Sequence, residues 1–175
     1  GASRVSSALD LFDARVAAWF RRRYGAPTGV QELAWPRIAA GEHVLAVAPT
    51  GSGKTLAGFL WALDRLLTGA WEGGAVRVLY VSPLKALNSD IERNLRSPLA
   101  ELRRELASSG FDPPAVHVGV RSGDTPPAER ARMLRRAPEI LITTPESLNL
   151  LLLSARAGGL LSGVRTVILD EIHAV

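Results

Sequence analysis

The segment that most constrains the fold is a glycine-rich turn between an apolar run and a helical run. It reads Ala48-Pro49-Thr50-Gly51-Ser52-Gly53-Lys54-Thr55. Glycines at this spacing let the backbone curl until several N–H groups converge on one point, which suits a phosphate group. The following helix adds the positive end of its dipole. We therefore predict a nucleotide-binding loop over residues 49–55, in which Lys54 reaches the β- and γ-phosphates and the Thr55 hydroxyl binds Mg²⁺.

A pair of adjacent carboxylates near the end of the sequence complements this loop. Asp170 and Glu171 follow the apolar run 164–169, and His173 comes two residues later. Asp170 is predicted to hold Mg²⁺, mainly through water, and Glu171 to polarise an attacking water as general base. Two carboxylates so close repel each other unless a cation lies nearby, which also favours a metal. The candidate catalytic residues are Lys54, Asp170, Glu171 and His173.

Short apolar runs alternate with helical runs along the chain. Strands are predicted over residues 43–48, 76–81, 115–120, 139–143 and 164–169. Helices are predicted over residues 9–24, 29–40, 54–67, 85–107, 127–136 and 145–155, with Pro98 expected to break or restart the fourth. This alternation is typical of a mostly parallel sheet with helices on both faces. The predicted fold class is therefore α/β.

The composition narrows the possible functions. A length of 175 residues suits one domain, and a net charge of +4 with 19 Arg and 2 Lys favours an acidic partner such as nucleic acid. Both lysines lie inside candidate functional motifs, Lys54 in residues 48–55 and Lys85 in residues 82–87. The sequence has no Cys, which excludes disulfides and zinc–thiolate sites and fits a reducing cytoplasm. The longest apolar stretches fall far short of the ~20 residues that cross a bilayer, so no membrane association is expected.

In order and spacing, the two motifs resemble those of superfamily 2 helicases of the DExH type, here Asp-Glu-Ile-His. The resemblance implies a RecA-like P-loop NTPase domain that uses ATP and Mg²⁺. Residues 27–31 resemble the Q motif of that family, in which a Gln amide reads the edge of adenine. Thr28 and Gln31 are therefore further candidate ATP-binding residues, although Gln31 is also an ordinary polar residue at the start of a helix.

Three other segments match family motifs that contact nucleic acid. They are residues 82–87 (motif Ia), 121–125 (the Gly-Asp motif) and 143–147 (motif Ib). All three are predicted at carboxyl ends of parallel strands, where open α/β sheets place their ligands. Each one alone is also a well-capped turn from strand to helix. The candidate nucleic-acid contacts are Pro83, Lys85, Arg121, Gly123, Thr143, Thr144, Pro145 and Glu146.

Within the superfamily, these motifs and the opening at residues 19–28 look most like the Lhr group, the large helicase-related proteins. That resemblance implies ATP-dependent, 3′-to-5′ translocation on single-stranded DNA, with unwinding of DNA or RNA–DNA duplexes, and a role in DNA repair. The Arg21-Arg22-Arg23 run is better explained as a solvated helix end, where cations offset the dipole.

The resemblance also predicts the domain organisation. Residues 1–42 are expected to form N-terminal helices with the Q motif, and residues 43–175 an incomplete first RecA-like domain, truncated after the Walker B strand. The second RecA-like lobe, with its arginine fingers, and the C-terminal domains are expected elsewhere in a longer chain. The 175 residues alone are therefore expected to be nearly inactive.

Three alternatives remain open on the sequence alone. The chain could belong to a DExH RNA helicase, or to a translocase that does not unwind duplexes. It could be a P-loop ATPase without a nucleic-acid substrate, such as a transport or remodelling motor. It could also be a module that only binds nucleotide or a partner.

Overall fold

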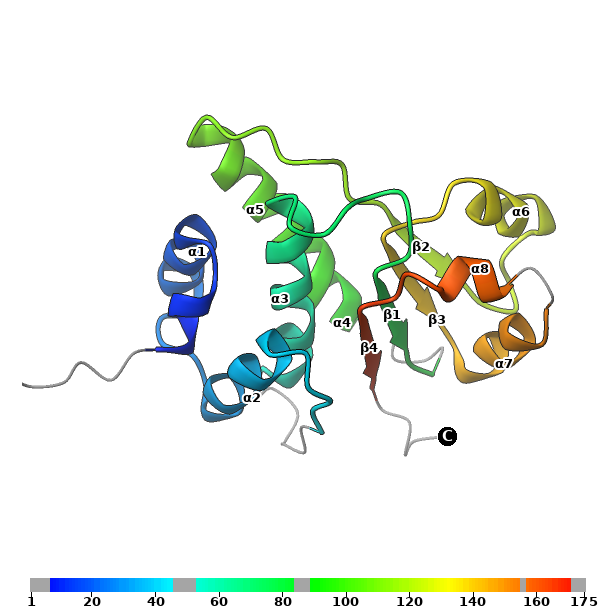
Figure 1. Cartoon of the computed structure of the whole chain (residues 1–175), viewed down its shortest axis with the longest axis horizontal. Helices are drawn as coiled ribbons and strands as arrows, with labels where there is room; N and C mark the ends of the chain where they lie inside the picture. Colours follow the sequence, from blue (N-terminus) through cyan, green and yellow to red (C-terminus); the bar gives the residue numbers. More distant parts are fainter. Residues whose placement is uncertain (1–6, 46–52, 84–88, 155–156, 171–175) are drawn as a thin grey trace, which may run out of the picture.

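A computed structural model describes residues 7–45, 53–83, 89–154 and 157–170 (Figure 1). Its centre is a four-stranded, fully parallel sheet in the order β2-β3-β1-β4. The strands are β1 (Val78–Val81), β2 (Val118–Arg121), β3 (Ile140–Thr143) and β4 (Thr166–Leu169). The predicted α/β class with a parallel sheet is confirmed.

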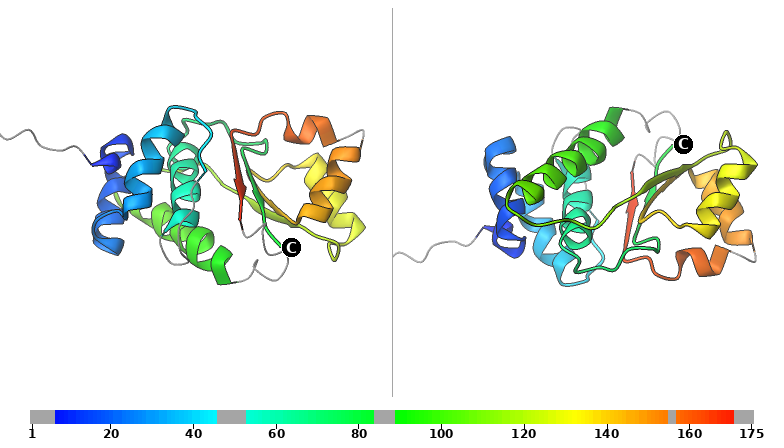
Figure 2. Two further views of the ribbon diagram at one scale, coloured as in Figure 1. Left: turned by 90° about the horizontal axis from the view of Figure 1, so that it is seen from below. Right: turned by 90° about the horizontal axis from the view of Figure 1, so that it is seen from above.

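Helices cover both faces of the sheet (Figure 2). One face carries α1 (Ala14–Tyr24), α2 (Gly29–Ala39), α3 (Lys54–Leu67), α4 (Ser89–Ile91) and α5 (Ser97–Ser108). The other face carries α6 (Pro127–Arg135), α7 (Pro145–Leu153) and α8 (Ala157–Leu161). None of the described helices is long and apolar enough to span a membrane.

The predicted strand over residues 43–48 is not seen in its described part. Residues 42–45 form no strand, and the Leu45 side chain is 90% exposed. A parallel strand exists only where a neighbour completes its ladder, and no described strand pairs with these residues. Residues 46–48 lie outside the described part of the chain.

The edge strand β4 differs from the two central strands. All side chains of β1 and β3 are buried, as expected for strands covered on both faces. In β4, Ile168 packs toward Gly58 of α3, whereas Val167 and Leu169 point to the opposite face and are 55% and 65% exposed. The far edge of β4 has no hydrogen-bonded partner among the described residues.

The long helical region around Pro98 is continuous but not uniform. A π-helical turn, Glu92–Arg96, joins α4 to α5, and Pro98 lies in the first turn of α5. Proline has no N–H to donate, and its ring clashes with the carbonyl four residues earlier in an ideal helix. The wider π turn relieves that conflict. The sequence predicts a disturbance at Pro98, and the structure resolves it without a break in the helical backbone.

The N-terminal run predicted as one helix is divided in two. A 3₁₀ turn, Ala8–Leu11, precedes α1, and Phe12 and Asp13 separate them. The Asp13 carboxylate caps α1 by accepting the Arg15 N–H at 2.9 Å. Phe12 turns inward and contacts Trp35 and Trp61 edge to face, with centroids 4.9 and 5.2 Å away. Burial of this aromatic side chain accounts for the break, which helical spacing alone did not reveal.

The short helix α8 was not predicted from the sequence. It contains consecutive glycines, which have low helix propensity. Leu160 and Leu161 pack against the second hydrophobic cluster, whose buried members include Val76 and Leu141. Tertiary packing therefore overrides local propensity in this segment.

A buried carboxylate fixes α1 to α3. Asp64 of α3 is inaccessible to solvent; its Oδ2 accepts the Asp13 N–H at 2.7 Å, and its Oδ1 accepts two N–H groups of Arg65. Burial raises the pKa of the Asp64 carboxyl, and the hydrogen bond from Arg65 offsets part of the rise. Trp35 fixes a different helix, α2, to α3, because its Nε1 donates to the Ala57 carbonyl of α3 at 3.0 Å.

Replacing Asp64 with Ala is expected to loosen α1, because the Asp13 N–H and Arg65 lose their acceptor. A hydrogen bond to a charged group contributes about 1.5–3 kcal/mol, so amide exchange in α1 should accelerate by about 10- to 100-fold. Hydrogen-exchange mass spectrometry on the intact protein measures this. Asp64→Asn retains an acceptor for Asp13 and should have a smaller effect. Unchanged exchange in Asp64→Ala would contradict the anchoring role.

Candidate nucleotide site and nucleic-acid edge

The register of the sheet brings the ends of its strands to one level. Val81 lies opposite Thr143 on one side and Leu169 on the other, and Thr143 lies opposite Arg121. The ladder extends one residue further where the Ser82 N–H donates to the Thr143 carbonyl. Because all four strands are parallel, the residues that follow them gather at one edge of the sheet. This edge carries the predicted sites.

The centre of the candidate nucleotide site joins the start of α3 to the end of β4. The Thr55 hydroxyl donates to Asp170 Oδ2 at 3.0 Å, although 115 residues separate them. Asp170 is 7% exposed, and its N–H donates to the Val81 carbonyl at 2.9 Å. Lys54 and Thr55 are the first two residues of α3, where the positive end of the helix dipole favours an anion. The two predicted metal-binding residues are thus in direct contact.

The donor set fits Mg²⁺. This ion prefers a few protein oxygens and keeps several waters, with substrate phosphates completing its octahedron. A hydroxyl and a carboxylate lie side by side at Thr55 and Asp170, and no described residue forms an ion pair with that carboxylate. Among the described residues no group of three His, Asp or Glu side chains could hold a metal by itself. Such a site suits a metal that arrives with a nucleotide.

The Q-motif residues Thr28 and Gln31 are held against the phosphate-binding loop. They form a capping box at the start of α2, in which Gln31 Oε1 accepts the Thr28 N–H at 3.0 Å. Gln31 is 2% exposed, and its Nε2 donates to the Gly53 carbonyl at 3.1 Å. Both ends of the amide are therefore used within the chain here. Adenine recognition by Gln31 stays a prediction.

Seven of the predicted site residues lie outside the described part of the chain. They are Pro49, Thr50, Gly51 and Ser52 of the loop, Lys85 of motif Ia, and Glu171 and His173 after β4. Their predicted roles stay predictions.

The predicted nucleic-acid contacts at this edge of the sheet include both buried and accessible residues. The Thr143 hydroxyl is buried and donates to the Arg121 carbonyl at 2.8 Å. Thr144 is also buried, and its Oγ1 caps α7 by accepting the Ser147 N–H at 3.2 Å. These hydroxyls therefore shape the edge. The predicted contacts that are at least partly exposed are Pro83, Arg121, Gly123, Pro145 and Glu146.

The loop after β2 is stabilised by hydrogen bonds from its own side chains and from Arg130, a residue that no sequence motif identifies. The Ser122 N–H donates to Thr125 Oγ1 at 2.9 Å, and the Asp124 N–H donates to Ser122 Oγ at 3.3 Å. From α6, Arg130 Nη2 donates to the carbonyls of Ser122 and Gly123. Only tertiary structure brings Arg130 onto the loop, so no local sequence pattern distinguishes it from the other arginines of α6.

Arg121 lies beside this loop, and its charge has no ion-pair partner among the described residues. Burial, and to a lesser degree the positive charge of Arg130, lowers the pKa of the Arg121 guanidinium. Two neighbouring cations at the end of a strand are stabilised by an anion.

The comparisons with known proteins agree with this geometry. Residues 28–175 match the sequence profile of the family described as DEAD/DEAH box helicase.

The chain belongs to the DEAD/DEAH box helicase family.

Within the family, this helicase chain is most clearly related to Lhr proteins. It is 54% identical over 168 residues to the Lhr helicase/probable uracil glycosylase of Mycolicibacterium smegmatis, covering 95% of the chain and 11% of that protein. It is 44% identical to the ATP-dependent helicase Lhr-Core of Methanocaldococcus jannaschii, covering 95% of the chain and 20% of that protein. The chain thus spans between a tenth and a fifth of these relatives. The predicted resemblance to Lhr is confirmed.

A solved structure supports the same placement. The helicase chain superposes on the Mycobacterium smegmatis helicase Lhr bound to ssDNA and AMP-PNP with a TM-score of 0.86 and 52% identity. The match covers 97% of this chain and 21% of the other. The RecA-like arrangement expected from the motifs is thereby confirmed.

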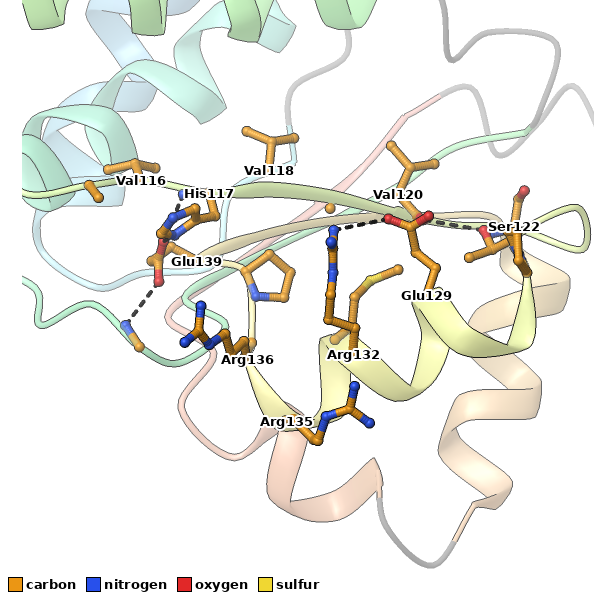
Figure 3. A pocket seen from close by; sticks show the side chains of 18 of the residues that line it. Val116, His117, Val118, Val120, Ser122, Glu129, Arg132, Arg135, Arg136 and Glu139 are labelled. Atoms are coloured by element: carbon orange, nitrogen blue, oxygen red, sulfur yellow. Dashed lines mark hydrogen bonds and ion pairs between the residues drawn. The ribbon is translucent and has the colours of Figure 1, made fainter.

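A large cleft in the helicase chain lies away from the nucleotide site. It has a volume of about 1270 Å³ and runs along β2 and α6, at the opposite side of the sheet from β4 (Figure 3). Arg132 and Arg135 of α6 and Arg136, which follows that helix, line the cleft. The buried Glu139 accepts the backbone N–H groups of Gly74 at 2.9 Å and His117 at 2.7 Å, so it holds the chain together there. Cleft volume alone does not locate the chemistry of this domain.

Gly53 and Gly69 provide a matched test of the loop packing. Both have φ of +83°, so alanine causes similar backbone strain at each. A Cβ on Gly53 would lie 2.3 Å from Gln31 Nε2, whereas one on Gly69 meets nothing within 4 Å. Gly53→Ala is expected to weaken nucleotide binding about tenfold or more, or by ~1.4 kcal/mol, because the loop or Gln31 must move. Gly69→Ala should leave it unchanged. Titration with a fluorescent ATP analogue measures both.

A double variant isolates the cause of that loss. If the clash with Gln31 is responsible, Gly53→Ala should cost less in a Gln31→Ala background than in the wild type. An equal loss in both backgrounds would show that backbone strain, rather than the contact with Gln31, controls the loop.

Proposed function

We propose that this chain is the ATP-binding part of the first lobe of an ATP-dependent helicase that acts on nucleic acid. The observation that carries the proposal is the contact between Thr55 and Asp170, at the same sheet edge as Arg121 and Gly123. A nucleotide site and a phosphodiester-binding surface on one rigid edge allow hydrolysis to be coupled to movement along a strand. The relative bound to ssDNA and AMP-PNP supports this pairing of ligands.

Each residue has a proposed role in hydrolysis. The loop 49–53 surrounds the phosphates with N–H donors, and Lys54 neutralises charge on the β- and γ-phosphates. Thr55 and Asp170 hold Mg²⁺, which when bound supplies charge neutralisation at the phosphate oxygens. Glu171 orients and deprotonates the attacking water, and His173 is a further proposed catalytic residue. Gln31 and Thr28 recognise adenine in the ATP-bound state, which requires the Gln31 amide to exchange its present partners.

The nucleic-acid edge is proposed to contact a single strand through its phosphates. Arg121 supplies charge, and Gly123, which has no side chain, lets the backbone approach closely. Pro83 and Pro145 are further proposed contacts. The buried hydroxyls of Thr143 and Thr144 hold the shape of this edge. Lys85 and Glu146 complete the proposed contacts. In detail, we propose 3′-to-5′ translocation on single-stranded DNA with unwinding of DNA or RNA–DNA duplexes. This part of the proposal rests on the likeness to Lhr proteins.

The chain is proposed to work with a second RecA-like lobe in the same protein. ATP then lies between two lobes, and an arginine of the second lobe contributes on the order of 10³–10⁵ in rate. Residues 1–42 are proposed to supply the N-terminal helices with the Q motif, and residues 43–175 the RecA-like part. A cytoplasmic location and a role in DNA repair are further proposals that rest on the same relatives.

An RNA helicase and a translocase without unwinding remain the alternatives. Discrimination between DNA and RNA depends on contacts with the 2′-hydroxyl. The relative that was solved with bound ssDNA favours DNA as the substrate. A P-loop ATPase without a nucleic-acid substrate is disfavoured by the family match and by Arg121 at the sheet edge, which has no ion-pair partner among the described residues.

The ATPase rate of the intact protein tests the proposal. Single-stranded DNA should stimulate the rate strongly, and Glu171→Gln should lower the stimulated rate by about 10²–10⁴, since it removes the general base. Single-stranded RNA serves as the comparison strand. A rate that responds to neither nucleic acid would contradict the assignment of the edge and leave only a nucleotide-hydrolysing domain.

Arg121→Gln tests the proposed phosphate contact directly. Each lost contact to a single strand should reduce the slope of log affinity against log salt by about 0.7, because one fewer counterion is released. Fluorescence anisotropy with labelled DNA at several salt concentrations measures the slope. Arg136→Gln is the matched control, because Arg136 is exposed at the opposite end of α6 from the edge. Equal effects of both substitutions would indicate only a change in net charge.

A further inference from the structure

Tyr80 connects the hydrophobic core to the candidate metal site. Its side chain is fully buried in β1, and its ring lies 5.0 Å from that of Phe59 in α3. The Tyr80 hydroxyl donates to Asp170 Oδ2 at 2.7 Å. The other residues of β1 are Val78, Leu79 and Val81, which carry no polar side-chain atom. A phenylalanine would fill the same space, so packing alone does not account for the hydroxyl.

The hydrogen bonds of Asp170 are unevenly shared between its two oxygens. Oδ2 accepts from the hydroxyls of both Thr55 and Tyr80, at 3.0 and 2.7 Å. No hydrogen bond from a described residue reaches Oδ1. Two donors on one oxygen fix the rotation of a carboxylate and leave the other oxygen for an additional ligand.

The two donors differ in how firmly they are held. Thr55 lies in the first turn of α3, at the end of the predicted phosphate-binding loop, and its oxygen is itself a proposed metal ligand. Tyr80 is held in the middle of the sheet: it pairs in register with Ile168 of β4, and the Asp170 N–H donates to Val81 of β1. Donor and acceptor therefore lie on adjacent, hydrogen-bonded strands.

We propose that Tyr80 is a positioning residue of the magnesium site: its hydroxyl holds Asp170 Oδ2 and so presents Oδ1 to a metal-bound water. The inference rests on the proposed function, because it assumes that Asp170 serves Mg²⁺. Tyr80 makes no contact with the nucleotide in this role. It acts through the orientation of Asp170, which a rigid supporting hydrogen bond is suited to maintain.

Tyr80→Phe in the intact protein tests the inference. A fluorescent ATP analogue is titrated at a series of Mg²⁺ concentrations and separately in EDTA. The Mg²⁺ concentration at half-maximal enhancement of nucleotide binding should rise about tenfold, as expected for loss of one hydrogen bond to a charged group. Affinity in EDTA should stay unchanged, because the loop and Lys54 are intact. Tyr24→Phe is the matched control: it makes the same chemical change in α1, where Tyr24 packs beside Phe20.

The possible results separate this inference from the proposed function. An unchanged Mg²⁺ midpoint in Tyr80→Phe, while Asp170→Asn shifts it, overturns the role of Tyr80 and leaves the metal site standing. An equal loss of affinity with and without Mg²⁺ shows a packing defect and also overturns it. If Asp170→Asn itself leaves the midpoint unchanged, the metal assignment fails and the role of Tyr80 fails with it. In an Asp170→Asn background, Tyr80→Phe should cause no further shift.

Discussion

The candidate site depends on the register of one parallel sheet. Because Val81 lies opposite both Thr143 and Leu169, residues from distant parts of the sequence meet at a single edge. Sheet hydrogen bonds and two buried central strands make that edge rigid. A parallel sheet requires a crossover between successive strands, and the crossover from β3 to β4 begins with α7, which Thr144 caps. The same geometry therefore supplies both the anion-binding backbone groups and the side chains that neutralise charge.

The N-terminal helices contribute more than additional core. Asp64 ties the start of α1 to the last turn of α3, and Trp35 ties α2 to the same helix. Gln31 then contacts Gly53 at the point where the phosphate-binding loop enters α3. Any displacement of α2 is thus transmitted directly to the loop. This is a physical route by which the N-terminal segment can influence nucleotide binding without contacting the phosphates.

The exposed surfaces away from the candidate site also indicate where the chemistry of this domain lies. The cleft beside β2 and α6 is large, but its buried glutamate is satisfied by backbone donors, and its arginines lie far from Asp170 in the order of the sheet. The exposed Val167 and Leu169 of β4 are apolar and carry no reactive group. Chemistry in this fold resides at the strand ends, because only there do helix N-termini, carboxylates and cations converge.

The local sequence was sufficient to determine most of the architecture. The helix over residues 54–67 and the approximate positions of four strands follow from helical spacing and apolar alternation. These features depend on interactions between residues that are close together in the sequence. The family also follows from motif order, because several short motifs in one sequence rarely coincide by chance.

Tertiary structure alone decided the remaining features. The break at Phe12, the helix α8 and the missing strand at residues 43–45 depend on packing or pairing partners that are distant in the sequence. The hydroxyl of Tyr80 and the guanidinium of Arg130 have no local pattern that marks them, since each is defined by a contact across the fold. A sequence motif identifies groups that act on a ligand, whereas groups that orient those residues are revealed only when the chain is folded.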